Sequence, residues 1–378
     1  MRIALERIEI QDFRNLERVS LNFPAEGVAL IGDNGHGKTN LLEAIYYLQI
    51  LRSIRDARDQ DLTRFDASGF HIAAKVHSPA AHEIGVGFER ASKKKRVTID
   101  GLVPRRMSDA LGKLPSVMFS PRDLELVSGS PSERRRYLDL MLALTDRKYL
   151  SALQHYRANL ARRNASLRNA TKRGANDSEV AVWEPALADH GSVLIESRAK
   201  WVNDSAAEFA RVSEEIGEIG QARIRYVCAF AESEARSDVL LAALEERRAL
   251  DMRRGITSVG PHRDDLEITL DGRDLRLFGS AGQQRTAAIA LRMLEAATLR
   301  DQAGAEPLLL LDDPFAELDI HRAARILLVL EKRGLGQTIL AVPRESDIPP
   351  GLMRLERLHV RDGTVKVWLP PAIGKVSG

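Results

Sequence analysis

The chain has 378 residues, of which 44% are hydrophobic and 29% charged, so we expect a globular protein of about two domains. Its single cysteine, Cys228, excludes an internal disulfide framework and fits a reducing compartment. The N-terminus lacks the apolar segment of a signal peptide and no apolar run approaches about 18 residues, which predicts a cytoplasmic location without a membrane partner.

The basic residues of the chain are clustered. The net charge is only +3, but lysine and arginine gather in runs at Lys93 to Arg96, Arg105-Arg106, Arg134 to Arg136, Arg162-Arg163, Lys172-Arg173, Arg247-Arg248 and Arg253-Arg254. Such runs can neutralise nucleic-acid phosphates, although solvated helix faces give the same pattern. The candidate DNA contacts are Lys93, Lys94, Lys95, Arg134, Arg135 and Arg136.

The first 120 residues alternate short apolar strands with turns and one clear helix. "GVALIGDNGHGKTNLLEAIYYL" is typical of a strand, a glycine loop and a helix with Leu41, Ile45 and Leu48 on one stripe. Farther along, an Asp100-Gly101 turn after an alternating run predicts a β-hairpin.

A mostly helical segment follows, over residues 121–254. Ser130, Pro131 and Glu133 form a typical helix start, and Tyr137, Leu140, Met141 and Leu144 would line the buried face of that helix. "TKRGANDSEV" predicts a polar loop between antiparallel helices, and "ARIRYVCAF" is a short strand candidate. Heptads are not sustained, so the pattern predicts a helical arm and not a long coiled coil.

Strand patterns return in residues 255–378. Leu266, Ile268 and Leu270 alternate before an Asp271-Gly272 turn, and "PLLLLDD" and "QTILAV" predict strands on either side of a helix near residues 323–331. We therefore expect one α/β domain built from residues 1–120 and 255–378, with the helical arm inserted between its halves.

Residues Gly32 to Thr39, "GDNGHGKT", match the phosphate-loop pattern between an apolar strand and a helix. Loop N–H groups would cradle ATP phosphates, Lys38 would supply charge, and the Thr39 hydroxyl would bind Mg²⁺. The predicted nucleotide-binding residues are Gly32, Asp33, Asn34, Gly35, His36, Gly37, Lys38, Thr39 and Asn40.

A second part of the predicted site is "LLLLDDPFAELD", Leu308 to Asp319. Asp312 ends a buried parallel strand, where a doubly wound sheet binds ligands, and would orient Mg²⁺. Asp313 is the candidate for polarising the attacking water. Lys38, Asp312 and Asp313 are thus the predicted catalytic residues, although two aspartates can also simply cap the turn after a core strand.

The stretch "GSAGQQRT" opens another helix but carries no lysine. It resembles the signature loop of ABC-type ATPases, which implies that Ser280, Gly282 and Gln283 contact the γ-phosphate of ATP bound by another subunit. The helix N-terminus supplies N–H groups and a partial positive charge, so a lysine is unnecessary. The alternative is an ordinary glycine turn before a helix.

Together with "FRNL", "SPSERRR", "GPHRDD" and "GQQRT", these motifs resemble the RecF family of bacterial DNA repair proteins, relatives of the SMC and Rad50 heads. The resemblance spans residues 12–319. It implies an ABC-type ATPase head with a helical arm, ATP-dependent homodimerisation, weak DNA-stimulated ATP hydrolysis and DNA binding. It also implies action at gaps and stalled forks with RecR and RecO to help load RecA, and links to replication restart and SOS induction.

Two features depart from the wider ABC pattern. Asp313 stands where a glutamate is usual, which suits slow hydrolysis, and "AVPRESD" after Leu340 offers no switch histidine as a γ-phosphate sensor.

His262 has no second ligand at metal-binding spacing, which favours a structural or interface role. The alternative functions are an ABC transporter ATPase subunit and a DNA-binding scaffold with a vestigial ATP site.

Overall fold

The computed structural model describes residues 3–78, 80–173, 177–230, 236–315, 320–334 and 336–367. By its internal contacts the chain divides into two compact units. Unit 1 comprises Met1–Pro121 with Glu295–Gly378, and unit 2 comprises Arg122–Leu294. None of the helices in the described ranges has both the length and the apolar character that a bilayer crossing requires.

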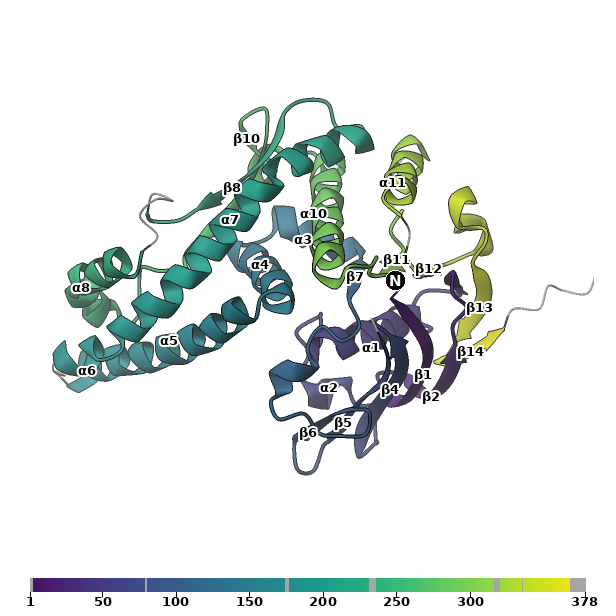
Figure 1. Cartoon of the computed structure of the whole chain (residues 1–378), viewed down its shortest axis with the longest axis horizontal. Helices are drawn as coiled ribbons and strands as arrows, with labels where there is room; N and C mark the ends of the chain where they lie inside the picture. The colour runs from purple at the N-terminus through teal and green to yellow at the C-terminus, as the bar shows by residue number, and fades with distance from the viewer. Residues whose placement is uncertain are drawn as a thin grey trace, which may run out of the picture. The chain divides into compact units, whose positions relative to one another are not determined.

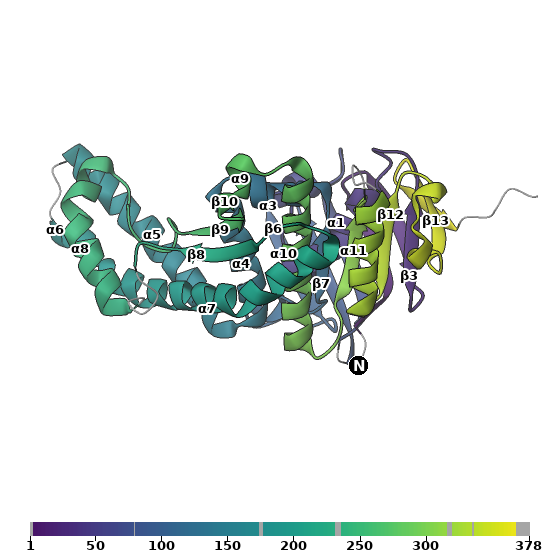
Figure 2. The ribbon, with the colours of Figure 1, turned by 90° about the horizontal axis from the view of Figure 1, so that it is seen from above.

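A six-stranded sheet forms the centre of unit 1, in the order β14-β13-β3-β12-β11-β7. Five strands run parallel and only β14 runs antiparallel to its neighbour. Their bounds are β3 (Gly27–Ile31), β7 (Ser116–Phe119), β11 (Leu308–Asp312), β12 (Thr338–Val342), β13 (Glu356–Arg361) and β14 (Thr364–Val367). Every residue of β3 and β12 is buried, as expected for parallel strands covered on both faces. Figure 2 shows β12, β3 and β13 together.

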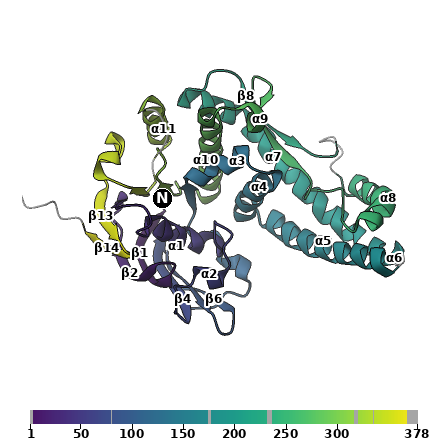
Figure 3. The same cartoon turned by 180° about the vertical axis from the view of Figure 1, so that it is seen from behind.

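Unit 1 also contains an antiparallel sheet in the order β2-β1-β4-β5-β6. Its strands are β1 (Ala4–Phe13), β2 (Leu16–Asn22), β4 (Gly69–His77), β5 (Ala81–Glu89) and β6 (Lys94–Ile99). Helix α1 (Lys38–Ile50) contacts both sheets (Figure 3). It is therefore buried almost all round, whereas the sequence predicted a single buried stripe. The rings of Phe13, Tyr47 and Phe70 meet edge to face between α1 and this sheet. The other helices are α2 (Asp59–Leu62), η1 (Met107–Ala110) and α11 (Ile320–Lys332), with η4 (Glu345–Asp347) and η5 (Pro350–Leu352) near the end.

Unit 2 is mainly helical. Helices α5 (Arg147–Arg173), α7 (Glu184–Ile216) and α8 (Ser237–Arg254) pack side by side (Figure 1), while a small sheet has the order β10-β9-β8. The remaining elements are η2 (Pro121–Leu124), α3 (Glu125–Ser128), α4 (Pro131–Thr145), α6 (Asp177–Ala181), β8 (Ala222–Val227), β9 (Asp265–Leu270), β10 (Arg273–Asp274) and α9 (Leu275–Phe278). Helix α10 (Ala281–Ala303) begins in unit 2 and ends in unit 1. The predicted polar loop lies partly within α5 and α6, and only residues 174–176 fall outside the described part of the chain.

Helix α4 begins at the position that its sequence predicts, although the Ser130 side chain makes no capping bond to the described backbone. Pro131 occupies the first turn after Ser130, whose backbone is extended. Of the predicted buried face, Tyr137 and Met141 are buried, but Leu140 and Leu144 are only half-buried, and Leu138 and Leu142 are buried instead.

The second boundary between the units differs from the expected one. We expected the α/β head to resume at residue 255, whereas the compact units divide after Leu294. The reason is a long-range pairing: β9 runs antiparallel to β8, with Ile224 opposite Ile268, and an Asp271-Gly272 turn joins β9 to β10. Strand β9 therefore completes a sheet in unit 2.

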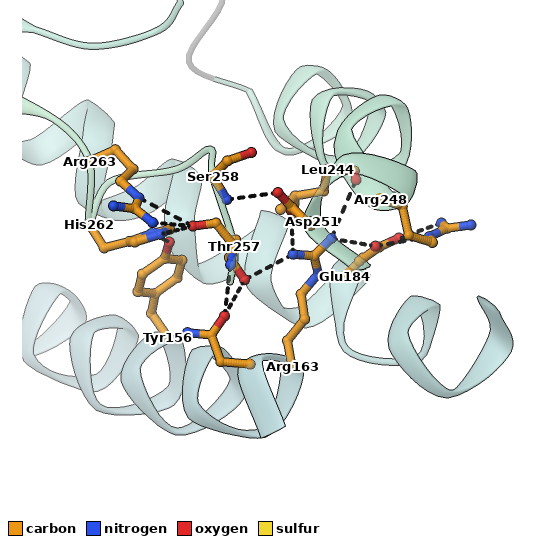
Figure 4. Close-up of polar contacts among 11 residues, drawn as sticks. Tyr156, Arg163, Glu184, Leu244, Arg248, Asp251, Thr257, Ser258, His262 and Arg263 are labelled. Atoms are coloured by element: carbon orange, nitrogen blue, oxygen red, sulfur yellow. Dashed lines mark hydrogen bonds and ion pairs between the residues drawn. The ribbon is translucent and has the colours of Figure 1, made fainter. Parts of the chain in front are cut away.

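A buried polar network joins three helices of unit 2 to the loop before β9 (Figure 4). The fully buried guanidinium of Arg163 lies 2.8 Å from the Asp251 carboxylate and 2.9 Å from that of Glu184. It also donates to the Thr257 hydroxyl at 2.9 Å, and Arg248 pairs with Glu184 from α8. Paired and hydrogen-bonded charges are the form in which ionised groups are tolerated in a protein interior, so this network fixes the loop to the helices.

His262 of the predicted "GPHRDD" motif is part of the same loop. Its Nδ1 lies 2.6 Å from the Tyr156 hydroxyl and its Nε2 lies 3.0 Å from the Thr257 carbonyl oxygen (Figure 4). Burial lowers the pKa of His262 to about 4. In the described parts of the chain, no cluster of three or more His, Cys, Asp or Glu side chains could hold a metal. These contacts match the structural role that the sequence favoured.

The low pKa of His262 predicts a pH-dependent stability. The unfolded chain, with a histidine pKa of about 6.5, binds a proton that the folded chain excludes until about pH 4, so acidification through this window destabilises the fold. Between pH 7 and pH 4.5 the wild type should lose roughly 2–3 kcal/mol more unfolding free energy than His262→Gln. Urea unfolding at both pH values measures the difference, and equal losses would contradict a neutral buried imidazole.

Candidate nucleotide-binding site

The predicted phosphate loop lies between β3 and α1 in unit 1. Gly35 and Gly37 have φ angles of 85° and 111°, in the left-handed region that glycine adopts without strain. A Cβ atom at Gly37 would also lie 2.9 Å from Asn15 Oδ1. The loop therefore turns tightly into the first turn of α1, where free N–H groups and the helix dipole favour an anion.

Lys38 is folded over its own loop. Its ammonium donates to the carbonyl oxygens of Gly32 and Asp33, the latter at 2.9 Å, and only 6% of the residue is exposed. Burial lowers the pKa of Lys38, while the charges of Asp312, Asp313 and Asp33 act in the opposite direction. A cation held in a poorly solvated place beside free N–H groups is suited to an anionic ligand.

Thr39 and Asp312 meet although 273 positions separate them in the sequence. The Thr39 hydroxyl donates to Asp312 Oδ1 at 2.9 Å, because the carboxyl ends of parallel β3 and β11 lie at the same edge of the sheet. Burial raises the pKa of Asp312, while its bond to Thr39 and the charge of Arg55 lower it. A hydroxyl and a carboxylate oxygen side by side fit Mg²⁺, which prefers oxygen ligands.

Asp313 has a left-handed backbone, with φ of 46°. Its N–H donates to the Ala341 carbonyl oxygen of β12 at 2.9 Å, which fixes the turn that leaves β11. The negative charge of Asp313 also acts to raise the pKa of Lys38. The structure therefore brings Lys38, Thr39, Asp312 and Asp313 together, as predicted, while their roles in catalysis stay predictions.

Four side chains around the predicted residue Asn40 were not predicted as site residues: those of Arg14, Asn15, Glu43 and Arg55. Asn40 donates to Asn15 Oδ1 at 2.9 Å and accepts from Arg55 at 2.8 Å, and Arg55 also pairs with buried Glu43. Arg14 pairs with Glu43 from the turn between β1 and β2. The "FRNL" stretch contains Arg14 and Asn15, but only the folded chain places that turn against the phosphate loop.

The predicted signature residues lie at the start of α10, in unit 2. Ser280 is exposed, and its N–H donates to Gln283 Oε1 at 2.9 Å while the Gln283 N–H donates to Ser280 Oγ at 3.3 Å. This reciprocal pair is a capping box, which holds the helix start in place. The Gly282 carbonyl oxygen accepts from the Thr286 hydroxyl at 3.1 Å.

The predicted DNA contacts differ in how accessible they are. Lys93, in the turn before β6, and Lys94, the first residue of β6, are exposed. Lys95 instead pairs with Asp59 at 2.8 Å and donates to the Leu51 carbonyl oxygen. Lys95 therefore has a structural role in unit 1.

The arginine run of α4 is more enclosed. Arg134 is 4% exposed, pairs with Asp265 at 2.8 Å and donates to the carbonyl oxygens of Val127 and Gly129. Arg135 donates to the Asp264 carbonyl oxygen at 2.7 Å, and burial lowers its pKa. Arg136 is half-buried. We therefore withdraw Arg134 as a DNA contact, because its guanidinium is already occupied inside unit 2.

Comparison with known proteins establishes the family of this chain. A family model described as the RecF/RecN/SMC N terminal domain matches residues 4–347. The DNA replication and repair protein RecF of Herpetosiphon aurantiacus is 34% identical over 383 residues, covering 96% of this chain and 99% of that protein. The chain belongs to the RecF family.

Solved structures agree with this assignment. The recombination mediator protein RecF with ATP, from the RecFOR pathway, is 29% identical, with a TM-score of 0.88 over 97% of this chain and 98% of that one. The Smc head domain of Pyrococcus furiosus, 17% identical, has a TM-score of 0.56 over 97% of this chain and 96% of that one and thus shares the fold. The predicted fold class, an α/β ABC-type ATPase head with a helical insertion, is confirmed.

Proposed function

We propose that this chain is an ATP-dependent DNA-binding clamp of recombinational DNA repair that dimerises on ATP and is reset by slow hydrolysis. The observation that carries this proposal is the group formed by Lys38, Thr39 and Asp312 at the carboxyl edge of the parallel sheet. The solved relative that is named as an ATP complex supports ATP as the ligand.

Each residue of the group has a defined task in this proposal. The N–H groups of Gly32 to Thr39 and the Lys38 ammonium bind the phosphates, for which Lys38 exchanges its bonds to the loop carbonyls. Thr39 and Asp312 would hold Mg²⁺, which would supply positive charge beside the phosphate oxygens. Asp313 orients the attacking water; its carboxylate is one methylene shorter than glutamate, which suits slow turnover.

Dimerisation would follow from contacts that ATP alone completes. In this proposal Ser280, Gly282 and Gln283 of a second copy bind the γ-phosphate, and the positive end of the α10 helix dipole favours an anion there. ADP lacks that phosphate, so the affinity between subunits depends on the nucleotide. The ATPase would thus act as a switch.

The proposed partners are DNA, RecR and RecO. DNA would be held through its phosphates, with the exposed Lys93 and Lys94 as the contacts that the fold leaves accessible. A solved relative named as a recombination mediator protein of the RecFOR pathway supports RecR and RecO as partners. Action in the cytoplasm, towards RecA loading at gaps and stalled forks, is part of the same proposal. Replication restart and SOS induction belong to the same proposal.

Sedimentation velocity with ATP, with ADP and without nucleotide tests the proposal. We expect dimers with ATP, in the presence or absence of duplex DNA, and monomers with ADP. A chain that stays monomeric with both ATP and duplex DNA would refute the clamp. A parallel hydrolysis assay, with and without DNA, separates the clamp from a DNA-binding scaffold with a vestigial site, which would show no turnover in either condition.

A further inference from the structure

The turn between β13 and β14 is hydrogen-bonded to the phosphate loop. The Gly363 N–H donates to the His36 carbonyl oxygen at 2.9 Å, and the Asp362 N–H donates to His36 Nδ1 at 3.0 Å. Oδ1 of Asp362 lies 3.0 Å from the same ring nitrogen. His36 is thus bound to the turn through both its backbone and its side chain, in the middle of the "GDNGHGKT" loop.

The same hairpin touches the loop surroundings at two more places. A Cβ atom built on Gly32, the first loop residue, would lie 2.2 Å from the carbonyl oxygen of Val360 in β13. One built on Gly363 would lie 2.1 Å from the carbonyl oxygen of Asn15, whose side chain contacts Asn40 in the first turn of α1. A side chain at Gly32 or Gly363 would therefore collide with these backbone oxygens, so both positions require glycine.

The hairpin has a rigid base. Strand β13 pairs in parallel with β3, the strand that leads into the loop, and Leu358 and Val360 are buried. The turn residues Asp362 and Gly363 have φ angles of 48° and 75°, which are typical of a tight hairpin turn. A contact from this turn therefore fixes the loop relative to the central sheet.

A phosphate-binding loop must hold several N–H dipoles pointing at one place, although these dipoles repel one another without the anion. A loop held in its binding shape beforehand loses less conformational entropy when the ligand binds. We propose that the β13–β14 hairpin is part of the nucleotide site and that His36 is a positioning residue, which joins the hairpin to the loop and raises nucleotide affinity. This inference rests on the proposed ATP binding and names the device that organises it.

Nucleotide titration of the full chain tests the proposal. Loss of the imidazole bond in His36→Ala should weaken ADP and ATP binding by the same factor, roughly three- to tenfold. The factor is equal because both nucleotides carry the phosphates that the loop holds. His36→Asn should restore wild-type affinity, since its amide can accept from the Asp362 N–H or donate to the Asp362 carboxylate. Lys366→Ala, an exposed change in β14, is the matched control and should bind as the wild type does.

Hydrogen exchange gives a second measurement that does not depend on affinity. Nucleotide binding should slow amide exchange at Asp362, whose N–H donates to the His36 imidazole, in the wild type and in His36→Asn, but not in His36→Ala. The inference is overturned if His36→Ala binds ADP as tightly as the wild type does, if His36→Asn is as weak as His36→Ala, or if only ATP binding is weakened. Failure of the wild type itself to bind any nucleotide would instead remove the proposed function.

Discussion

Lys38→Met should weaken ATP binding by about a hundredfold or more and abolish ATP-dependent dimerisation. In the folded chain the Lys38 ammonium is nearly buried and is bonded only to loop carbonyls among the contacts described, beside the carboxylates of Asp312 and Asp313. Charge-assisted hydrogen bonds contribute roughly 1.5–3 kcal/mol each, so losing the cation costs two or more powers of ten in affinity. Isothermal titration with ATP measures the change.

The stability of the same variant distinguishes a binding role from a structural one. Burial lowers the pKa of Lys38, which means that the fold disfavours the charged form. Methionine has a similar length without the charge, so Lys38→Met should unfold at the same temperature as the wild type or higher. Lys94→Met, at an exposed position of β6, is the control for losing a lysine. ATP affinity within threefold of the wild type would show that this loop does not bind the phosphates.

The parts of the site that follow from neighbouring residues could be predicted. The sequence from Gly27 to Ile50 contains a buried strand, a glycine loop and a helix, and each depends on residues close in the chain. Asp312 was predictable because a leucine run ending in aspartate places the carboxylate at the carboxyl edge of a parallel sheet. Local sequence therefore specified both partners of the Thr39 to Asp312 contact.

The surroundings of the loop could not be predicted in the same way. Asp362-Gly363 carries the Asp-Gly hairpin signal, so the turn itself could have been found. The same signal correctly predicted the hairpin at residues 271–272, whereas the predicted hairpin at residues 100–101 is only a turn closed by an isolated bridge between Ile99 and Leu102. The position of the Asp362-Gly363 turn against His36 depends on β13 pairing with β3, more than 320 positions away in the sequence. Long-range pairing also explains why residues 255–294 pack with unit 2.

Burial of charge is a further property that sequence leaves open. Arg134 to Arg136 look like a basic patch, but Arg134 pairs with Asp265, which lies 131 positions later and is brought close by β9. Arg163 and Arg248 likewise neutralise buried acids inside the arm. A run of arginines predicts DNA contacts only where the fold leaves the guanidinium groups accessible, as it leaves the ammonium groups of Lys93 and Lys94.

Ser280→Arg should bind ATP as the wild type does and yet fail to dimerise with ATP. Ser280 is exposed and its described contacts are to residues of its own helix, so we expect the substitution to leave Lys38, Thr39 and Asp312 unchanged. In a dimer held together through the γ-phosphate, a long cationic side chain at Ser280 would fill the space of the contacting hydroxyl. We expect the dimer dissociation constant with ATP to rise by at least about a hundredfold, which corresponds to roughly 3 kcal/mol.

The substitution also removes a helix cap, and that effect has to be separated from the loss of the contact. Ser280 and Gln283 form the capping box of α10, whose loss costs about 1 kcal/mol of stability. Ser280→Ala loses the same cap without added bulk or charge, so it should lose stability like Ser280→Arg but weaken dimerisation less. Sedimentation of both variants with ATP, beside ADP titrations of the monomers, makes the comparison. If Ser280→Arg dimerised as the wild type does, the helix start at Ser280 would be an ordinary capped turn, and the second subunit would have to be held elsewhere.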